Sequence, residues 1–167
     1  MLKKLSSYKK NSILYLLIIA VGIYLDQLSK ALVVEHLKPI YDVHLIEGVL
    51  HLTYSENRGA AFGMLSDNRW VFMIISTVMI IGISVYLFYP KRQSAPIFSI
   101  GAAAVVSGGI GNMIDRLILG YVVDFINVEL INFAIFNVAD CFVCVGAGLM
   151  VLSLVLDIIK EAKEKKK

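Results

Sequence analysis

Several aspartate and asparagine residues lie at or near the ends of long uncharged segments of this sequence. Asn112 and Asp115 end a long uncharged run, Asp124 follows on a short β-rich segment, and Asp140 opens the next apolar run. Charge within or beside a membrane segment usually marks function. Two aspartates held close together cannot both ionise easily, so one can activate a water while the other protonates a carbonyl. We therefore expect Asp124 and Asp140 to meet and to hydrolyse a peptide bond.

The composition predicts that a membrane surrounds these residues. Of the 167 residues, 58% are hydrophobic, and the mean hydropathy is +0.76. Soluble domains have about 45–50% apolar residues. The net charge of +3 is small, and no surface typical of nucleic-acid binding is evident. We expect a single integral membrane domain, residues 1–167, with membrane lipid around it and no nucleic-acid partner.

Four apolar segments are long enough to cross a bilayer as helices, which needs about 20 residues each. They are residues 13–34, 70–89, 97–117 and 137–156. The third segment carries a stripe of small residues, Gly101, Ala104, Gly108 and Gly111, which favours close packing against another helix. Asn112 and Asp115 continue this stripe, so we expect both to point into the bundle.

The segments between the spans, residues 35–69 and 118–136, predict a small β-sheet. Val43–Ile46 and Val49–Tyr54 flank Glu47-Gly48 as in a hairpin. Tyr121–Val128 and Phe133–Phe136 are rich in β-branched and aromatic residues, with a bend near Glu129-Leu130. The fold class we expect is a membrane α-helical, four-transmembrane-helix bundle with a small extracytoplasmic β-sheet.

The distribution of basic residues orients this bundle. Lysine and arginine are concentrated in the N-terminal segment, at Lys91-Arg92 and in the C-terminal tail. Basic loops face the cytoplasm, so the N- and C-termini should lie in the cytoplasm. The polar clusters then converge on the extracytoplasmic face, which would hold Asp26, Lys30, Asn57, Asn112, Asp115, Arg116, Asp124, Asn137 and Asp140.

Five motifs resemble those of the lipoprotein signal peptidase family, signal peptidase II, and they occur in the family's order over most of the chain. They are Asp26-Gln27-Leu28-Ser29-Lys30, Asn57-Arg58-Gly59-Ala60-Ala61-Phe62-Gly63, Gly111-Asn112-Met113-Ile114-Asp115-Arg116, Val122-Val123-Asp124-Phe125 and Phe136-Asn137-Val138-Ala139-Asp140. Each motif alone is weak, whereas the set is specific. Ser29 stands where the family has threonine as often, a mild departure.

The resemblance implies an aspartic endopeptidase that is a multi-pass protein of the bacterial cytoplasmic membrane, with its active site on the extracytoplasmic side. It implies cleavage of diacylglyceryl-modified prolipoproteins just before the lipidated cysteine, no cofactor, and inhibition by the cyclic lipopeptide globomycin. We also expect a monomer. The implied site residues fall into three groups: Asp124 and Asp140 as the catalytic pair; Asn57, Asn112, Arg116 and Asn137 as substrate-binding or supporting residues; and Asp26, Lys30, Gly108, Asp115 and Ala139 as structural residues.

Other interpretations stay open for several of these residues. Asn137 and Asp140 also fit a helix N-cap, Arg116 fits a favourable charge at a helix C-terminus, and Asp26 with Lys30 fits a helix ion pair. A small ion or proton transporter with intramembrane carboxylates is the alternative function. It would spread charge across the membrane depth, whereas the predicted cytoplasmic halves of the spans are nearly uncharged.

The cysteines and histidines do not indicate a site. Cys141 and Cys144 lie in an apolar run without the context of a redox motif. His36, His44 and His51 are irregularly spaced and lack a pattern of metal ligands. We predict no metal site and three surface histidines. The segments 57–63 and 35–53 are our candidates for clamping a peptide substrate.

Overall fold

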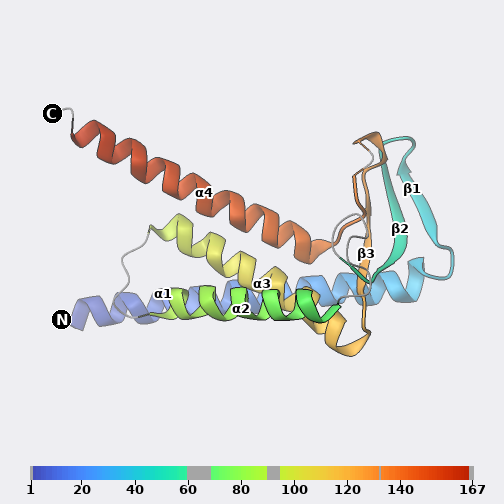
Figure 1. Ribbon diagram of the computed structural model, residues 1–167, viewed down its shortest axis with the longest axis horizontal. Coiled ribbons are helices and arrows are strands. Elements are labelled where there is room, and N and C mark those ends of the chain that lie inside the picture. The colour runs from blue at the N-terminus through green and yellow to red at the C-terminus, as the bar shows by residue number, and fades with distance from the viewer. Residues whose placement is uncertain (1, 60–68, 90–94, 132, 166–167) are drawn as a thin grey trace.

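Helices run lengthwise along the protein and carry a small sheet at one end (Figure 1). The computed structural model describes residues 2–59, 69–89, 95–131 and 133–165. Its α-helices are α1 (Leu2–Leu32), α2 (Arg69–Phe88), α3 (Pro96–Ile118) and α4 (Val138–Glu164). The start of α1 and the end of α4 lie at the end of the molecule away from the sheet (Figure 1), the arrangement that the basic residues predict.

Three helical stretches in the described residues are long and apolar enough to cross a membrane. They are Asn11–Leu37, Pro96–Ile118 and Val138–Glu164, and Met73–Phe88 of α2 is a shorter apolar helix. The predicted membrane α-helical fold is therefore confirmed, and the count of four spans stays a prediction. Large apolar side chains such as Leu17, Val78 and Val155 are exposed on these helices, as a lipid environment allows.

Two helices extend beyond the predicted spans. α1 begins at Leu2 instead of residue 13 and continues through a π-helical segment, η1 (Val33–Leu37), while α4 reaches Glu164 instead of residue 156. The turns added at the start of α1 contain four lysines, and those added at the end of α4 contain lysine and glutamate, which are good helix formers. The length of an apolar segment therefore predicts the part of each helix that can lie in lipid, but it does not predict the polar ends of the helix.

The sheet has three antiparallel strands in the order β1 (Asp42–Ile46), β2 (Leu50–Asn57) and β3 (Val122–Asn127). The predicted hairpin is confirmed, and Gly48 in its turn has a φ of +67°, which glycine adopts readily. The predicted strand Phe133–Phe136 is wrong. Phe136 makes only an isolated bridge with Ile126, and the predicted bend is a 3-10 turn, η3 (Glu129–Ile131).

Two apolar cores hold the site between helices and sheet. Val33 and Leu37 of η1 pack with Tyr54, Val123 and Phe125 of the sheet. A second core, within the helices, contains Tyr15, Leu87, Ala102 and Ala103. The first core fixes β2 and β3 against the end of α1, so the side chains at the ends of α3 and α4 face the sheet.

Glycines let α3 approach α4 closely. A Cβ at Gly108 would lie 2.2 Å from the Ala139 carbonyl oxygen, and one at Gly101 would lie 2.5 Å from the Gly146 carbonyl oxygen. Neither carbonyl can move without shifting α4. The predicted packing role of the small-residue stripe is therefore confirmed, and Gly108 sets the distance between α3 and the first turn of α4.

Candidate functional site

Asp124 and Asp140 both contact Asn137. Asp124 lies on β3, whereas Asp140 lies in the first turn of α4. The Asn137 side-chain amide donates to Asp124 Oδ1 at 2.6 Å, and the Asn137 backbone amide donates to Asp140 Oδ2 at 3.1 Å. The fold thus brings the two aspartates singled out by the sequence within hydrogen-bonding distance of one residue, Asn137.

Asn137 is also the N-cap of α4. Its Oδ1 accepts a hydrogen bond from the Asp140 backbone amide at 3.0 Å, and Asp140 returns a bond to the Asn137 backbone, which completes a capping box. The N-cap interpretation is therefore confirmed, and it does not exclude a role in the site. A capping box uses the oxygen of Asn137 and leaves its NH₂ group to hold Asp124.

Two further asparagines complete the support of the aspartates. Asn57 at the end of β2 donates to Asp124 Oδ2 at 2.9 Å. Asn112 of α3 donates to Asp140 Oδ1 at 2.8 Å, and its own Oδ1 accepts from Asn137 at 3.1 Å. Each aspartate is thus held by neutral amides from two different elements, which fixes its orientation without neutralising its charge.

Burial changes the acidity of Asp124. Its residue is 2% exposed, and this burial raises the pKa of Asp124 from its ordinary value of 3.8 to about 6. Repulsion from the Asp140 carboxylate acts in the same direction, while the hydrogen bonds from Asn57 and Asn137 oppose it. A carboxyl group with such a pKa can hold or release a proton near neutral pH.

A second polar cluster lies next to this pair and is centred on Lys30. The Lys30 Nζ atom lies 2.9 Å from Asp26 Oδ2 and 3.0 Å from Asp115 Oδ2, and it donates to Asn112 Oδ1 at 2.9 Å. Asp26, Lys30 and Asp115 are each at most 3% exposed. The predicted helix ion pair is present, and it extends across α3 to a second carboxylate.

The two carboxylates of this cluster anchor the backbone beside the two candidate catalytic residues. Asp26 Oδ1 accepts from the Ala139 backbone amide at 2.9 Å. Asp115 Oδ2 accepts from the Val123 backbone amide at 3.0 Å. Ala139 precedes Asp140 and Val123 precedes Asp124. The Lys30 cluster therefore fixes the position of the backbone that directly precedes each of the two aspartates.

Gln27 and Gly111 also join this cluster; the sequence predicts no separate role for Gln27 and predicts only helix packing for Gly111. Gln27 Nε2 donates to Asp115 Oδ1 at 3.0 Å and to the Gly111 carbonyl oxygen at 3.2 Å. A Cβ at Gly111 would lie 2.5 Å from Asp26 Oδ2, so this glycine makes room for the carboxylate. Their place inside the Asp26–Lys30 and Gly111–Arg116 motifs was the available signal.

Arg116 links α3 to the segment after β2. Its guanidinium donates to the Asn112 carbonyl oxygen at 3.3 Å and to the Gly59 carbonyl oxygen at 3.4 Å. The first contact fits the helix C-terminus interpretation, and the second one goes beyond it. Residues 60–63 of the predicted peptide clamp lie outside the described residues, whereas Asn57 and Gly59 lie beside the site as expected.

A cavity of about 360 Å³ opens between α1 and α3 next to the Lys30 cluster. Val34, Ile114, Ile118 and Val123 line it together with polar neighbours of the cluster. Neither Asp124 nor Asp140 lines this cavity, so it is not where a scissile bond would meet the two aspartates.

Within the described residues, the cysteines and histidines make no hydrogen bond to either aspartate, although Cys141 directly follows Asp140 in α4. Cys141 and Cys144 are free thiols. His36 and His44 are exposed as predicted, whereas the prediction of a surface residue is wrong for His51, which is 7% exposed. His51 is buried because it lies on the central strand, between β1 and β3.

Comparisons with known proteins give one consistent match. The family model for Signal peptidase (SPase) II matches residues 18–156. A lipoprotein signal peptidase from Halalkalibacterium halodurans is 42% identical over 154 residues, which cover 91% of this chain and 98% of the relative. One from Brevibacillus brevis is 43% identical over 143 residues, which cover 86% of this chain and 95% of the relative.

Solved structures give the same picture of the fold. One bacterial membrane enzyme matches with a TM-score of 0.78 at 32% identity, covering 86% of this chain and 88% of that one. Another structure of a bacterial membrane enzyme matches with a TM-score of 0.74, also at 32% identity, covering 84% of this chain and 91% of that one. The similarity extends over nearly the whole chain in each case.

Proposed function

The chain belongs to the signal peptidase II family of membrane aspartic proteases, and we propose that it removes the signal peptide from prolipoproteins with Asp124 and Asp140 as its catalytic pair. The cut falls just before the diacylglyceryl-modified cysteine. The observation that supports this assignment best is that Asn137 hydrogen-bonds both carboxylates. Two acids held by one residue can act on one water molecule and one peptide bond.

The pair acts as general base and general acid. The ionised aspartate takes a proton from water, and the water oxygen bonds to the carbonyl carbon while the protonated aspartate donates to the carbonyl oxygen. Collapse of this tetrahedral intermediate breaks the C–N bond while one aspartate takes a hydroxyl proton from the intermediate and the other gives a proton to the departing amine. We propose that Asp124 carries the shared proton in the free enzyme, because its burial raises its pKa to about 6.

The remaining site residues hold this pair in place. Asn57, Asn112 and Asn137 orient the carboxylates, and Arg116 positions the segment that begins at Gly59. Lys30, with its two buried aspartates, fixes the backbone on which the pair stands. These roles follow the hydrogen bonds described above, and none of them needs a metal or a cofactor.

The membrane explains the choice of substrate. We propose four spans, with α2 as the shorter one, both termini in the cytoplasm, and the sheet and dyad at the extracytoplasmic surface of the bacterial cytoplasmic membrane. The acyl chains of the substrate remain in the bilayer, where each buried CH₂ contributes about 0.8 kcal/mol. The enzyme then works as a monomer, and globomycin is expected to inhibit it.

The test uses purified enzyme with a diacylglyceryl-modified precursor and its unlipidated counterpart. We expect cleavage of the lipidated precursor only. Asp124→Asn and Asp140→Asn should each lower kcat by roughly 10³-fold or more, with an unchanged helical circular dichroism spectrum. Asp157→Asn is the matched control, because Asp157 is exposed on α4 away from the sheet.

Full activity of either dyad variant would refute the catalytic assignment. Equal cleavage of the unlipidated precursor would refute the role of the lipid in selecting substrate. The transporter alternative predicts ion flux through reconstituted vesicles without cleavage. The match to the signal peptidase II family over residues 18–156 does not favour it.

A further inference from the structure

Three potential metal ligands lie together on one face of the β1–β2 hairpin. Asp42 and His44 are two residues apart on β1, so their side chains point to the same face. His51 pairs directly with His44 across the two strands, which places it on that face as well. One ligand atom from each residue lies within 4.8 Å of the other two.

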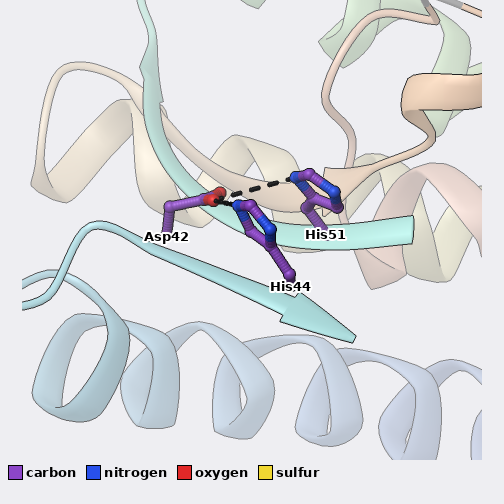
Figure 2. Close-up of side chains that lie close together, drawn as sticks. All are labelled: Asp42, His44 and His51. Atoms are coloured by element: carbon purple, nitrogen blue, oxygen red, sulfur yellow. Dashed lines mark ion pairs between the residues drawn. The ribbon is translucent and has the colours of Figure 1, made fainter. Parts of the chain in front are cut away.

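Both histidines turn a ring nitrogen toward the same carboxylate oxygen (Figure 2). Asp42 Oδ2 lies 2.8 Å from His44 Nε2 and 3.7 Å from His51 Nδ1. Donor atoms around a tetrahedral zinc ion are about 3.4 Å apart when the bonds are about 2.1 Å long. The observed separations bracket that value, so small side-chain movements suffice to seat an ion.

The outer side of each ring faces another carboxylate. His44 Nδ1 lies 2.8 Å from Glu47 Oε2, and His51 Nε2 lies 3.0 Å from Glu129 Oε2 of η3. In metal sites, the non-ligating nitrogen of a histidine commonly donates to a carboxylate, which leaves the lone pair of the other nitrogen on the metal. The hairpin repeats that arrangement twice.

Asp42 is held in the orientation that such a site needs. Thr53, its partner across the strands, donates to Asp42 Oδ1, and Asn127 of β3 donates to Thr53 Oγ1 at 3.2 Å. These bonds occupy one carboxylate oxygen and leave Oδ2 facing the histidines. A ligating carboxylate is typically supported in this way.

His51 turns its Nδ1 atom toward Asp42 and its Nε2 atom toward Glu129. Its side chain is 9% exposed, and within the described residues its buried Nε2 atom makes no hydrogen bond of good geometry, despite its distance of 3.0 Å from Glu129. A buried polar atom left without a partner is costly. Deprotonation of Nδ1 by a bound cation would place a proton on Nε2, from which Glu129 can accept.

We propose that Asp42, His44 and His51 form a binding site for a divalent transition-metal ion of the zinc type. Two imidazole nitrogens and one carboxylate oxygen suit zinc, whereas calcium and magnesium prefer oxygen ligands alone. The rings now stack with centroids 3.9 Å apart and planes 15° apart. They open by rotation of the exposed His44 so that both lone pairs meet the ion.

This site is separate from the catalytic aspartates. His51 and Ser55 are four residues apart on β2, roughly 13 Å along the strand, and Ser55 is the residue that pairs with Asp124. The ion would fasten β1 to β2, and through Glu129 it would tie η3 to the hairpin. Its role is therefore structural, and the dyad chemistry does not depend on it.

The test is calorimetric titration of Zn²⁺ into the full-length, tag-free protein in detergent at pH 7.5. We expect one equivalent to bind. His44→Ala and Asp42→Asn should each remove measurable binding, and Glu129→Gln should weaken it by about 10–100-fold. Bound Zn²⁺ should also raise the melting temperature of the wild type and leave that of His44→Ala unchanged.

The matched control is His36→Ala, because His36 is exposed and outside the cluster. It should bind Zn²⁺ like the wild type. Because His44 is exposed, its replacement should not disturb the fold, whereas replacing the buried His51 would. Absence of stoichiometric binding in the wild type would overturn the proposal. Equal loss of affinity in His36→Ala and His44→Ala would overturn it too.

Discussion

Two pairs of aspartates lie side by side in this protein and differ in their hydrogen-bonding partners; Asp26, Asp115 and Asp124 are buried, and Asp140 is half-buried. Asp26 and Asp115 share the ammonium group of Lys30. Asp124 and Asp140 are held by asparagine amides, and within the described residues no lysine or arginine lies within ion-pair distance of either. The first pair, the anchor pair, shares a cation and accepts hydrogen bonds from backbone amides, whereas in the second pair burial raises the pKa of Asp124.

The contrast teaches how one membrane surface can hold four carboxylates for two purposes. A carboxylate that contacts a cation still has lone pairs that can accept hydrogen bonds from backbone amides. Asp26 and Asp115 use theirs on Ala139 and Val123. A buried carboxylate beside neutral amides keeps a raised pKa, as Asp124 does. The anchors thus position the residues whose acidity is available for chemistry.

The largest effect on stability should follow from removing the cation of the anchor pair. Lys30→Met leaves two buried carboxylates without their counter-ion, and breaking a buried pair in this way costs about 3–5 kcal/mol. Chemical unfolding in detergent, followed by circular dichroism, measures the loss. The protein should unfold at much lower denaturant concentration or fail to accumulate.

The triple variant Lys30→Met, Asp26→Asn, Asp115→Asn is the control for this prediction. It removes the two charges together with their partner, so it should be more stable than Lys30→Met alone. If Lys30→Met unfolds at the same denaturant concentration as the wild type, the cluster is not an anchor and the comparison fails.

The Asp124–Asp140 pair should affect how the free energy of unfolding depends on pH. The native pKa of Asp124 is about 6 and its ordinary value is 3.8, so the folded protein keeps a proton that the unfolded chain releases. The resulting stability is fully present below about pH 4 and is lost as the pH rises through about 6. Its size is about 3 kcal/mol, since one pKa unit corresponds to about 1.4 kcal/mol.

Asp124→Asn isolates this contribution, because asparagine does not titrate. The difference in unfolding free energy between wild type and variant should change between pH 4 and 6, and it should be constant above pH 7. The kcat/KM of the wild type should also fall on the alkaline side with an apparent pKa near that of Asp124. A pH-independent difference in stability would show that folding does not raise the pKa of Asp124, and it would remove the reason for assigning the shared proton to this residue.

A smaller effect on stability is expected from a change at Gly108, where α3 packs closely against the first turn of α4. Gly108→Ala places a methyl group 2.2 Å from the Ala139 carbonyl oxygen, so α4 must move away from α3 and take Asp140 with it. Overpacking of this kind costs about 1–3 kcal/mol. We expect lower stability and slower cleavage, measured by thermal unfolding and by precursor processing.

Gly148→Ala is the matched control on the same pair of helices. No atom of the described residues lies within 4 Å of a Cβ at Gly148, and alanine is the better helix former by about 1 kcal/mol. This variant should be as stable as the wild type or slightly more so. Equal losses in the two variants would mean that the close approach at Gly108 does not matter.

Local patterns predicted most of the helices and strands, and they contained part of the information on the Asp42, His44 and His51 cluster. The Glu47-Gly48 turn predicts the hairpin, and pairing outward from this turn places His44 opposite His51. The structure has this pair, although Ile46 pairs with Leu50 and the register shifts between His44 and Ile46. The two histidines are seven residues apart in the sequence, so their spacing alone does not indicate that they pair. Asp42 was overlooked because it precedes the segment that had been predicted as the strand.

Long-range contacts were the part that the sequence could not provide. Lys30 and Asn112 are 82 residues apart, yet their side chains form a hydrogen bond. A pattern of residues predicts that Lys30 pairs with Asp26 four positions before it, but not that Asp115 of another helix completes the cluster. The burial of Asp124 is of the same kind, because it depends on Asn57 and Asn137 from other segments.

The smallest effect should come from a lysine that resembles Lys30 in chemistry and differs from it in burial. Lys38 Nζ lies 3.4 Å from Glu56 Oε1, and the Lys38 side chain is 46% exposed, compared with 4% for Lys30. Exposed pairs contribute little to stability because water and salt screen them. Lys38→Met should therefore shift the denaturant midpoint only slightly. Added salt should shrink that shift further, whereas the loss in Lys30→Met should persist. If the two variants lose similar stability, burial does not distinguish the lysines, and the difference between the anchor pair and the dyad needs another cause.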